Sequence, residues 1–372
     1  MKQGYYMVFL SSGEGVNRKI QMQIDEFNKY MDFTRIDIPE EKDSFAKKLQ
    51  QIIPTKGVGY DFEYALRLLK NPLLLYIRKG NIDLDFVKFL KAVKGLYPEC
   101  KIIIEFPVYP YYKELFSKGM CRNLKNIPIY IKDRLFRGQL KKYVDYISTF
   151  SEDEKIFNVP TLRIFNGIDV SSIVPIQNHE LNETIDIFSV ALLAPQHGYE
   201  RIIKGMDIYY KNGGKRDIKF HIVGYGTETK YYESLVKKYH LEKQVILYGR
   251  RVGEELDKLY EIADLGVTHL AMYKVSRPLG SFIKTGEYLA KGLPLITGCR
   301  VDILDRDEFP YFIEFENNDS PIDMNKIISF YDDIYQNGDK EEVASVCRKL
   351  AFQKADMPVA LRSITDYMRT LL

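Results

Sequence analysis

Short β-rich runs alternate with amphipathic stretches along residues 185–298, and this alternation constrains the fold more than any other feature. The β-rich runs cover residues 185–192, 218–226, 244–249, 265–270 and 293–298. The stretches between them can form helices that cross from one strand to the next. Such alternation predicts a parallel sheet with crossover helices, so we expect a doubly wound α/β domain here.

An earlier series of the same kind predicts a second α/β domain. Its β-rich runs cover residues 5–10, 33–38, 72–77, 101–106, 144–150 and 162–169. A chain of 372 residues is long enough for two domains of ordinary size. The stretch 170–184 is polar and aperiodic, which predicts an N-terminal domain over 1–169 and a C-terminal domain over 170–356. The tail, 357–372, is predicted to form one amphipathic helix.

The composition is that of a globular protein. Apolar residues make up 45% and charged residues 28%, and a net charge of +3 is too small to favour nucleic acid as a partner. The four cysteines are not spaced as a metal clip or a disulfide framework, which favours a cytoplasmic protein. The first residues are typical of a strand rather than a signal peptide, and no apolar run reaches the ~18–20 residues of a membrane span. Any membrane contact is expected to be peripheral.

The segment 281–298 predicts a short helix whose N-terminus can bind an anion. Ser281 is a suitable N-cap and Gly292 a suitable C-terminal stop. The first backbone amides of this helix have no partner within it, and the helix dipole adds about half a positive charge there. These amides belong to Phe282, Ile283 and Lys284.

Lys284 and Glu287 share one face of the predicted helix because they are three residues apart. The Lys284 ammonium adds a full positive charge to the anion site. The Glu287 carboxylate suits a ligand that carries hydrogen-bond donors next to its phosphates, such as ribose hydroxyls. The alternative is an ordinary surface ion pair, which would stabilise the helix only slightly.

The stretch "KTGEYLAKGLP" resembles the nucleotide-sugar segment of GT-B glycosyltransferases in the large retaining family 4, also called group 1. Further stretches that resemble this family occur in the expected order over 166–169, 197–210, 220–228 and 245–267. The stretches 197–210 and 104–114 resemble in particular its bacterial capsule and exopolysaccharide branch. The resemblance implies two Rossmann-like domains that face a cleft, with the tail helix packed on the first domain. It also implies a UDP- or GDP-sugar as donor substrate and no cofactor.

The same resemblance implies roles for individual residues. Glu287 would hold the donor ribose, and the amides of 282–284 would hold the diphosphate. The donor-binding loops would include Gly224, with the nucleobase near Arg250 and Arg251.

The sequence departs from the family pattern at three positions. Leu279 stands where the family has a first glutamate, and Leu192 and His197 stand where it has the arginine and lysine that hold the diphosphate. We expect Lys284 and His197, together with Arg277, to supply this charge instead.

Gly13 and Gly15 lie between the first expected strand and the first expected helix, where glycine lets a backbone approach a phosphate or a sugar. The pattern is not a complete dinucleotide fingerprint, because Arg18 occupies the position of the third glycine. The family resemblance implies that this loop faces the donor diphosphate or the acceptor, with Gly13 and Gly15 as donor-binding residues and the acceptor near Gly15. A plain tight turn is the alternative.

Glu105 ends an expected strand, and the rigid aromatic residues Tyr109 and Tyr111 follow it. A carboxylate in this position is suited to sugar hydroxyls, so the three residues are predicted to bind the acceptor. The alternative is that Glu105 stabilises the loop.

All five histidines lie beyond the first domain, which leaves no histidine base there and favours a retaining reaction. His197 lies between a strand and a helix, where it can contact the transferred sugar or the phosphates; a histidine that caps the helix is the alternative. Asp83 and Asp85 open a helix and are interpreted as caps. We therefore predict no metal site.

The segment 111–143 carries nine Lys or Arg residues and two acidic residues, a net charge of +7. Tyr, Phe, Leu and Ile alternate with these charges. A basic amphipathic stretch suits an anionic membrane surface or a lipid-phosphate acceptor. A solvated face is the alternative.

Together these patterns predict a retaining, metal-independent transferase that moves a hexose from a nucleotide sugar to a hydroxyl of a lipid-linked surface polysaccharide precursor. The predicted catalytic residues are Glu105, His197, Lys284 and Glu287. Because of Leu279 and the altered diphosphate pair, a catalytically silent GT-B protein is the main alternative. An NAD-dependent oxidoreductase is a weaker one.

Overall fold

The computed structural model describes residues 3–9, 13–39, 53, 60–111, 120–275, 279–335 and 339–372. The chain divides into two compact units. Unit 1 comprises Met1–Phe165 with Ala360–Leu372, and unit 2 comprises Asn166–Val359. The first unit therefore ends four residues before the predicted boundary.

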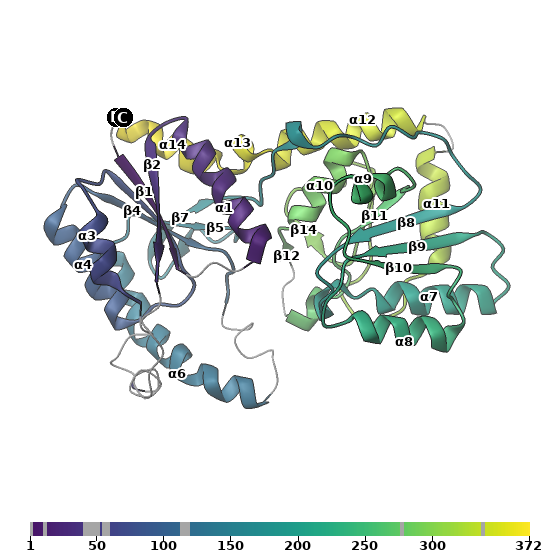
Figure 1. The fold of residues 1–372 in the computed structure, drawn as a ribbon, viewed down its shortest axis with the longest axis horizontal. Helices are drawn as coiled ribbons and strands as arrows, with labels where there is room; N and C mark the ends of the chain where they lie inside the picture. Colours follow the sequence, from purple (N-terminus) through teal and green to yellow (C-terminus); the bar gives the residue numbers. More distant parts are fainter. Residues whose placement is uncertain are drawn as a thin grey trace. The chain divides into compact units, whose positions relative to one another are not determined.

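Unit 1 contains a seven-stranded sheet in the order β2-β1-β3-β4-β5-β7-β6, parallel except for the β6–β7 pair (Figure 1). Its strands are β1 (Gln3–Phe9), β2 (Asp32–Ile38), β3 (Leu74–Arg78), β4 (Lys101–Phe106), β5 (Tyr146–Thr149), β6 (Lys155–Ile156) and β7 (Val159–Arg163). Its helices are α1 (Gly13–Asn28), α3 (Phe62–Leu68), α4 (Leu84–Leu96), α6 (Met120–Phe136), the 3₁₀ helix η1 (Arg137–Lys142) and α14 (Arg362–Leu371).

Both faces of this sheet are buried, which explains the nearly continuous apolar runs of its strands. On one face Leu75, Ile77 and Ile104 pack with Phe86 and Leu90 of α4. The amphipathic helix α1 covers the other face. There the rings of Tyr6 and Tyr76 contact Phe27.

Unit 2 contains a six-stranded parallel sheet in the order β10-β9-β8-β11-β13-β15. These strands are β8 (Ile185–Val190), β9 (Ile218–Val223), β10 (Val245–Gly249), β11 (Leu265–Val267), β13 (Leu295–Thr297) and β15 (Phe312–Glu314). Two short strands, β12 (Leu279–Gly280) and β14 (Arg300–Val301), form a separate pair. The α-helices are α7 (Glu200–Lys211), α8 (Thr229–Tyr239), α9 (Glu254–Tyr260), α10 (Ile283–Lys291), α11 (Met324–Tyr335), α12 (Lys340–Leu350) and α13 (Met357–Ala360), the last of which ends in unit 1. Shorter helical turns are η2 (Val170–Ser172), η3 (Pro195–His197), η4 (Met272–Val275) and η5 (Ala351–Ala355).

The strand order reverses once in each sheet. In unit 2 the chain first builds β8, β9 and β10 in one direction and then adds β11, β13 and β15 on the other side of β8. In unit 1 the reversal lies between β1 and β3. The carboxyl ends of the strands at such a reversal form a crevice in which open parallel sheets bind ligands.

The predicted fold class, two doubly wound parallel α/β domains, is confirmed. Two features differ from the expectation. The first helix begins at Gly13, so Gly13 and Gly15 lie in its first turn rather than in a loop. The tail forms two helices, α13 and α14, because the chain turns at Leu361 between them. Ser363 of α14 donates a hydrogen bond to the carbonyl of Arg163 at 2.7 Å.

Among the described residues, no helix is both long and apolar enough to cross a membrane.

Candidate functional site

The helix α10 begins at the point where the strand order of unit 2 reverses. Its N-cap is Phe282 rather than Ser281, and no side chain caps it. The Ser281 hydroxyl instead accepts a hydrogen bond from the backbone N–H of Asn166 at 3.1 Å. The predicted stop at Gly292 is confirmed, because this residue adopts a left-handed conformation with φ of 92°.

Lys284, in the first turn of α10, is buried and has neutral hydrogen-bond acceptors. Its Nζ donates to the hydroxyl of Tyr199 at 3.0 Å and to the carbonyl of Thr268 at 3.5 Å. Burial lowers the pKa of Lys284 to about 7, while the nearby charge of Glu287 acts in the opposite direction. The ammonium is therefore poised to gain free energy from an anion, because such a ligand favours its charged form.

A hydrogen-bonded chain fixes the Lys284 ammonium at the carboxyl ends of β8 and β11. Tyr199, which follows β8, lies within hydrogen-bond distance of the Ser189 hydroxyl. Ser189 in turn donates to the carbonyl of Val267, the last residue of β11, at 3.2 Å. Tyr199 and Ser189 were not predicted as site residues, because nothing in their local sequence pattern shows that they meet Lys284.

His197 is buried and neutral, so the positive charge expected from it is not available. Burial and the nearby charge of Lys284 lower the pKa of His197 to about 2. Its Nδ1 accepts a hydrogen bond from the backbone N–H of Ala194 at 3.0 Å, so the side chain caps the turn η3. Its backbone carbonyl accepts from the Leu270 amide at 2.9 Å, which joins the loops after β8 and β11.

Glu287 lies on α10 one turn beyond Lys284 and is partly exposed. Its negative charge acts to raise the pKa of Lys284, against the larger effect of burial. The helix therefore carries a buried cation and a partly exposed carboxylate on one side, as the spacing predicts.

Gly224 and the two arginines predicted for the donor loops contact residues of their own unit. Gly224 follows β9 with φ of 123°, and a Cβ there would lie 1.9 Å from the carbonyl oxygen of Ala191, so glycine is needed for close backbone packing. Arg251 donates from Nη1 to the carbonyl of Arg250 at 2.9 Å. Its Nε lies 3.8 Å from a carboxylate oxygen of Glu255. Arg277 lies outside the described residues.

Three exposed apolar side chains follow three neighbouring strands of unit 2. Leu192 follows β8, Tyr225 follows β9 and Val252 follows β10, with exposed fractions of 70%, 55% and 61%. The strand order β10-β9-β8 brings these chain segments to one edge of the sheet. In the sequence, Leu192 was recognised only as a departure from an expected arginine.

Glu105 in unit 1 is fully buried, so a role in binding sugar hydroxyls or in catalysis does not fit its position. Its carboxylate accepts hydrogen bonds from Tyr76 at 2.9 Å and Tyr6 at 3.3 Å, and it forms an ion pair with Arg78. Burial alone would raise the pKa of Glu105, but Arg78 and these hydrogen bonds hold it below its usual range. The carboxylate stabilises the sheet, because it joins β1, β3 and β4.

The other acceptor candidates differ in their availability. The Tyr111 hydroxyl donates to Asp133 at 2.6 Å, and the residue is buried, so a role in acceptor binding does not fit. Tyr109 is partly exposed, and its ring contacts that of Phe157 at a centroid distance of 6.0 Å. Gly15 is exposed at the start of α1, with open space where a Cβ would be.

Asp83 is the N-cap of α4, as predicted, and accepts a hydrogen bond from the Phe86 amide at 2.9 Å. Asp85 lies in the first turn of the same helix. Within the part of the chain that the structure describes, no group of three potential metal ligands gathers.

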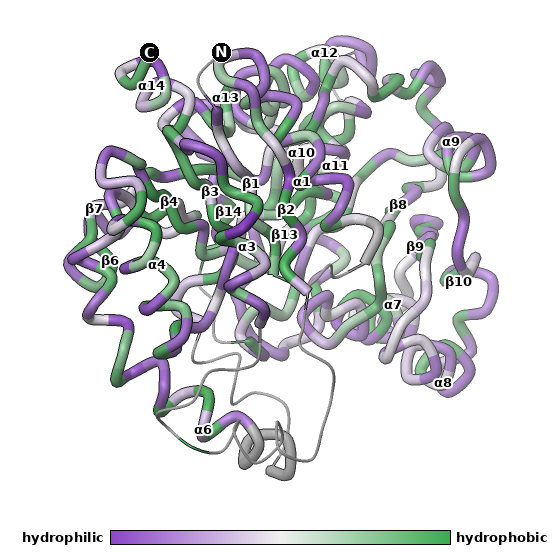
Figure 2. Tube along the Cα trace, turned by 60° about the vertical axis from the view of Figure 1, so that its left-hand side comes forward, coloured by the Kyte–Doolittle hydropathy of each residue, from purple (hydrophilic) through white to green (hydrophobic). Residues whose placement is uncertain are grey.

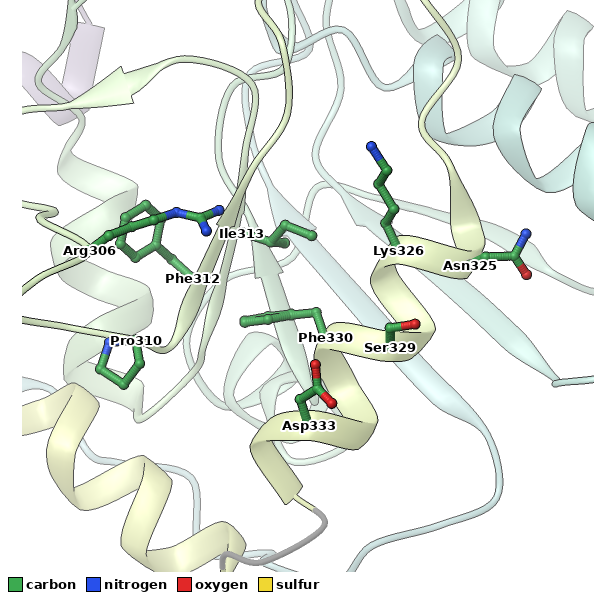
Figure 3. A pocket seen from close by; sticks show the side chains of 9 residues that line it. All are labelled: Arg306, Pro310, Phe312, Ile313, Asn325, Lys326, Ser329, Phe330 and Asp333. Atoms are coloured by element: carbon green, nitrogen blue, oxygen red, sulfur yellow. The ribbon is translucent and has the colours of Figure 1, made fainter.

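A hollow of about 420 Å³ lies between β15 and α11 (Figure 3). Arg306 and Lys326 contribute positive charges, Asp333 a negative one, and Ile313 and Phe330 apolar surface. None of the predicted site residues lines this hollow, so it is separate from the candidate site at α10.

A family model described as Glycosyl transferases group 1 matches residues 175–299, about a third of the chain. The matched segment includes β8, the loop of Tyr199, and α10. No curated protein sequence matches the chain.

Solved structures of glycosyltransferases resemble the whole chain. A glycosyltransferase from Rickettsia africae has a TM-score of 0.62 at 10% identity, covering 100% of this chain and 98% of its own. Anabaena Alr3699/HepE in complex with UDP-glucose has a TM-score of 0.61 at 12% identity, covering 100% of this chain and 100% of its own. Sucrose-phosphate synthase from Thermosynechococcus elongatus has a TM-score of 0.63 at 13% identity, with coverage of 100% and 99%.

At these identities the likeness establishes the fold. The protein has the GT-B fold of glycosyltransferases, which is built from two Rossmann-like domains. Its second unit contains the segment that matches group 1 glycosyl transferases.

Proposed function

We propose that this protein is a retaining GT-B glycosyltransferase that moves a hexose from a nucleotide sugar to a hydroxyl of a lipid-linked surface glycan. One observation carries the proposal. A buried lysine ammonium and the N-terminus of α10 lie together where the strand order of unit 2 reverses. This combination suits the diphosphate of a nucleotide sugar.

In the proposed complex, unit 2 binds the donor. Lys284 and the first amides of α10 hold the diphosphate, and Glu287 accepts hydrogen bonds from the ribose. The exposed side chains of Leu192, Tyr225 and Val252 give the flat nucleobase an apolar surface. The similar Anabaena protein was solved in complex with UDP-glucose, which supports a donor of this class.

The proposed reaction breaks the bond between the anomeric carbon and the diphosphate oxygen and forms a bond from that carbon to the acceptor oxygen. Negative charge develops on the departing diphosphate, where the Lys284 ammonium and the α10 amides stabilise it. The proton of the acceptor hydroxyl passes to a diphosphate oxygen. No histidine occurs in residues 1–169, so this part of the chain offers no histidine to act as the base.

Unit 1 is proposed to bind the acceptor, with Gly15 and Tyr109 as the remaining candidates among the predicted residues. No metal ion or cofactor takes part in the proposed reaction. We propose a location at the cytoplasmic face of the membrane, where a lipid-linked acceptor would be available.

The Lys284→Ala variant tests the proposal. The affinity of the protein for UDP and for GDP is measured by calorimetry, and the better ligand is then tested as its sugar conjugates. Loss of a charge-assisted contact worth about 1.5–3 kcal/mol should weaken binding about tenfold or more. Hydrolysis of the donor is measured with and without EDTA, and the two rates should agree.

Lys291→Ala is the matched control for this experiment. Lys291 is 8% exposed and Lys284 is 9% exposed, and both lie on α10, but Lys291 lies at the C-terminal end and pairs with Asp257 at 2.7 Å. It should retain its nucleotide affinity. Equal affinities of Lys284→Ala and the wild type would remove the proposed diphosphate site.

A catalytically silent GT-B protein is a second candidate, favoured by Leu279 and by the neutral state of His197. Such a protein would bind the nucleotide sugar without hydrolysing or transferring it. The donor-hydrolysis assay separates the two candidates.

A further inference from the structure

The helix α6 exposes a row of large aliphatic side chains. Ile127, Ile131 and Leu135 have exposed fractions of 40%, 40% and 57%. Because they are spaced by four residues, they lie on one face of the helix. Figure 2 shows apolar and polar residues alternating along this helix. Water-exposed aliphatic groups arranged in a continuous row are characteristic of an interaction surface.

The opposite side of α6 is anchored to unit 1, which fixes the direction of the exposed row. Asp133 is buried and accepts hydrogen bonds from the Ile82 amide at 3.0 Å and from the Tyr111 hydroxyl at 2.6 Å. Arg137 lies 3.3 Å from the other carboxylate oxygen of Asp133, and its guanidinium packs over the ring of Phe157. The aliphatic row therefore cannot turn inward without breaking these contacts.

Exposed basic residues accompany the row. Arg134 lies between Ile131 and Leu135, and Lys141 and Lys142 follow in η1. Lys132 is buried by contrast, so only part of the strongly basic sequence segment faces water. Figure 1 shows α6 at one end of unit 1.

We infer that the outer face of α6 docks on an anionic lipid bilayer, with Ile127, Ile131 and Leu135 inserted at the level of the headgroups. Arg134, Lys141 and Lys142 then contact lipid phosphates. The aliphatic row supplies apolar burial and the cations supply attraction to the negative surface, the two contributions that bind interfacial helices.

Charge favours lipid over a second copy of the chain. A symmetric dimer through this face would bring Arg134, Lys141 and Lys142 of each copy close to the same cations of the other. No such repulsion opposes an anionic membrane. The evidence for membrane docking does not depend on the proposed function. The proposed function only explains why docking would be useful, because a lipid-linked acceptor would be presented at the same membrane surface.

Vesicle co-sedimentation of the full chain tests the inference. Vesicles of phosphatidylcholine alone are compared with vesicles that also contain phosphatidylglycerol. The wild type should bind the anionic vesicles and bind the neutral ones at least about tenfold more weakly, because each cation near the surface contributes on the order of 1 kcal/mol. At 1 M salt part of the binding should remain, because salt screens the charges and leaves the apolar burial.

The Ile131→Asp variant separates insertion from simple charge attraction. It should lower the partition coefficient on anionic vesicles about tenfold or more, because it removes an aliphatic group that would be buried in the membrane and adds a negative charge. Ile208→Asp is the matched control, since Ile208 is a 47% exposed residue on α7 in the other unit. This variant should bind vesicles like the wild type.

Three results would overturn the inference. They are equal binding of the wild type to both kinds of vesicle, vesicle binding by Ile131→Asp that equals the wild type, and a wild-type dimer in sedimentation velocity that Ile131→Asp dissociates. Circular dichroism and nucleotide affinity verify that each variant is folded. Because nucleotide binding is measured separately, a protein that binds a donor but no vesicle refutes this inference alone, and one that binds vesicles but no nucleotide refutes only the proposed function.

Discussion

Lys284 combines positive charge with burial, and this combination makes donor binding dependent on pH. The pKa of Lys284 is lowered to about 7 in the free protein, so part of the population is neutral at this pH. A bound diphosphate favours the charged form and raises the pKa again. Affinity for the nucleotide sugar should therefore be highest below pH 7 and should fall as pH rises above it.

Calorimetry from pH 6 to 9, with the nucleotide sugar that binds best, measures this dependence. The diphosphate of a nucleotide sugar is esterified at both ends, so the ligand itself does not change its charge in this pH range. At pH 8 binding should take up protons, which appears as a heat that depends on the buffer. Lys284→Arg keeps its charge throughout and should flatten the profile. A wild-type affinity that is constant over this range would contradict the proposed role of Lys284.

The strands β1, β3 and β4 of unit 1 depend on one buried ion pair. Glu105→Gln removes its negative charge and leaves the Arg78 guanidinium, whose side chain is only 15% exposed, without a counter-ion. Breaking such a pair costs about 3–5 kcal/mol of unfolding free energy in buried sites. Urea denaturation followed by circular dichroism should show a loss of about this size.

Glu63→Gln on α3 is a suitable control, because it removes an ion pair with Arg67 in which both side chains are about four-fifths exposed. Its effect on the urea midpoint should be small. If Glu105→Gln left the stability unchanged and abolished transfer, the prediction that Glu105 binds the acceptor would regain support.

The molecule as a whole contains two units, each with a separate hydrophobic core. Only unit 2 is proposed to bind the donor, so a nucleotide should stabilise the two units unequally. At a ligand concentration about 100 times Kd the stabilisation is about 2.7 kcal/mol, which corresponds to a shift of about 5–10 °C for a domain of this size.

Differential scanning calorimetry of the full chain with and without nucleotide measures this difference. One transition should move and the other should stay, and Lys284→Ala should abolish the shift. A nucleotide-induced shift of the same size in both transitions would show that donor binding is not confined to unit 2.

Several features could be predicted from the sequence because they depend on residues close together in the chain. The alternation of apolar runs and amphipathic stretches predicted both doubly wound sheets. Gly292 predicted the end of α10, and Asp83 predicted the start of α4. Periodicity and capping need only a few neighbouring residues, so a linear pattern contains them.

The state of each site residue was decided only by the tertiary structure. Glu105 meets Tyr6, which is 99 residues away, and Lys284 meets Tyr199, which is 85 residues away. These contacts arise because parallel strands bring distant segments to one sheet, and burial there makes His197 neutral and lowers the pKa of Lys284. Sequence alone therefore predicted the main strands and crossover helices of the two sheets, and three-dimensional packing determined which polar side chains are buried, paired or available to a ligand.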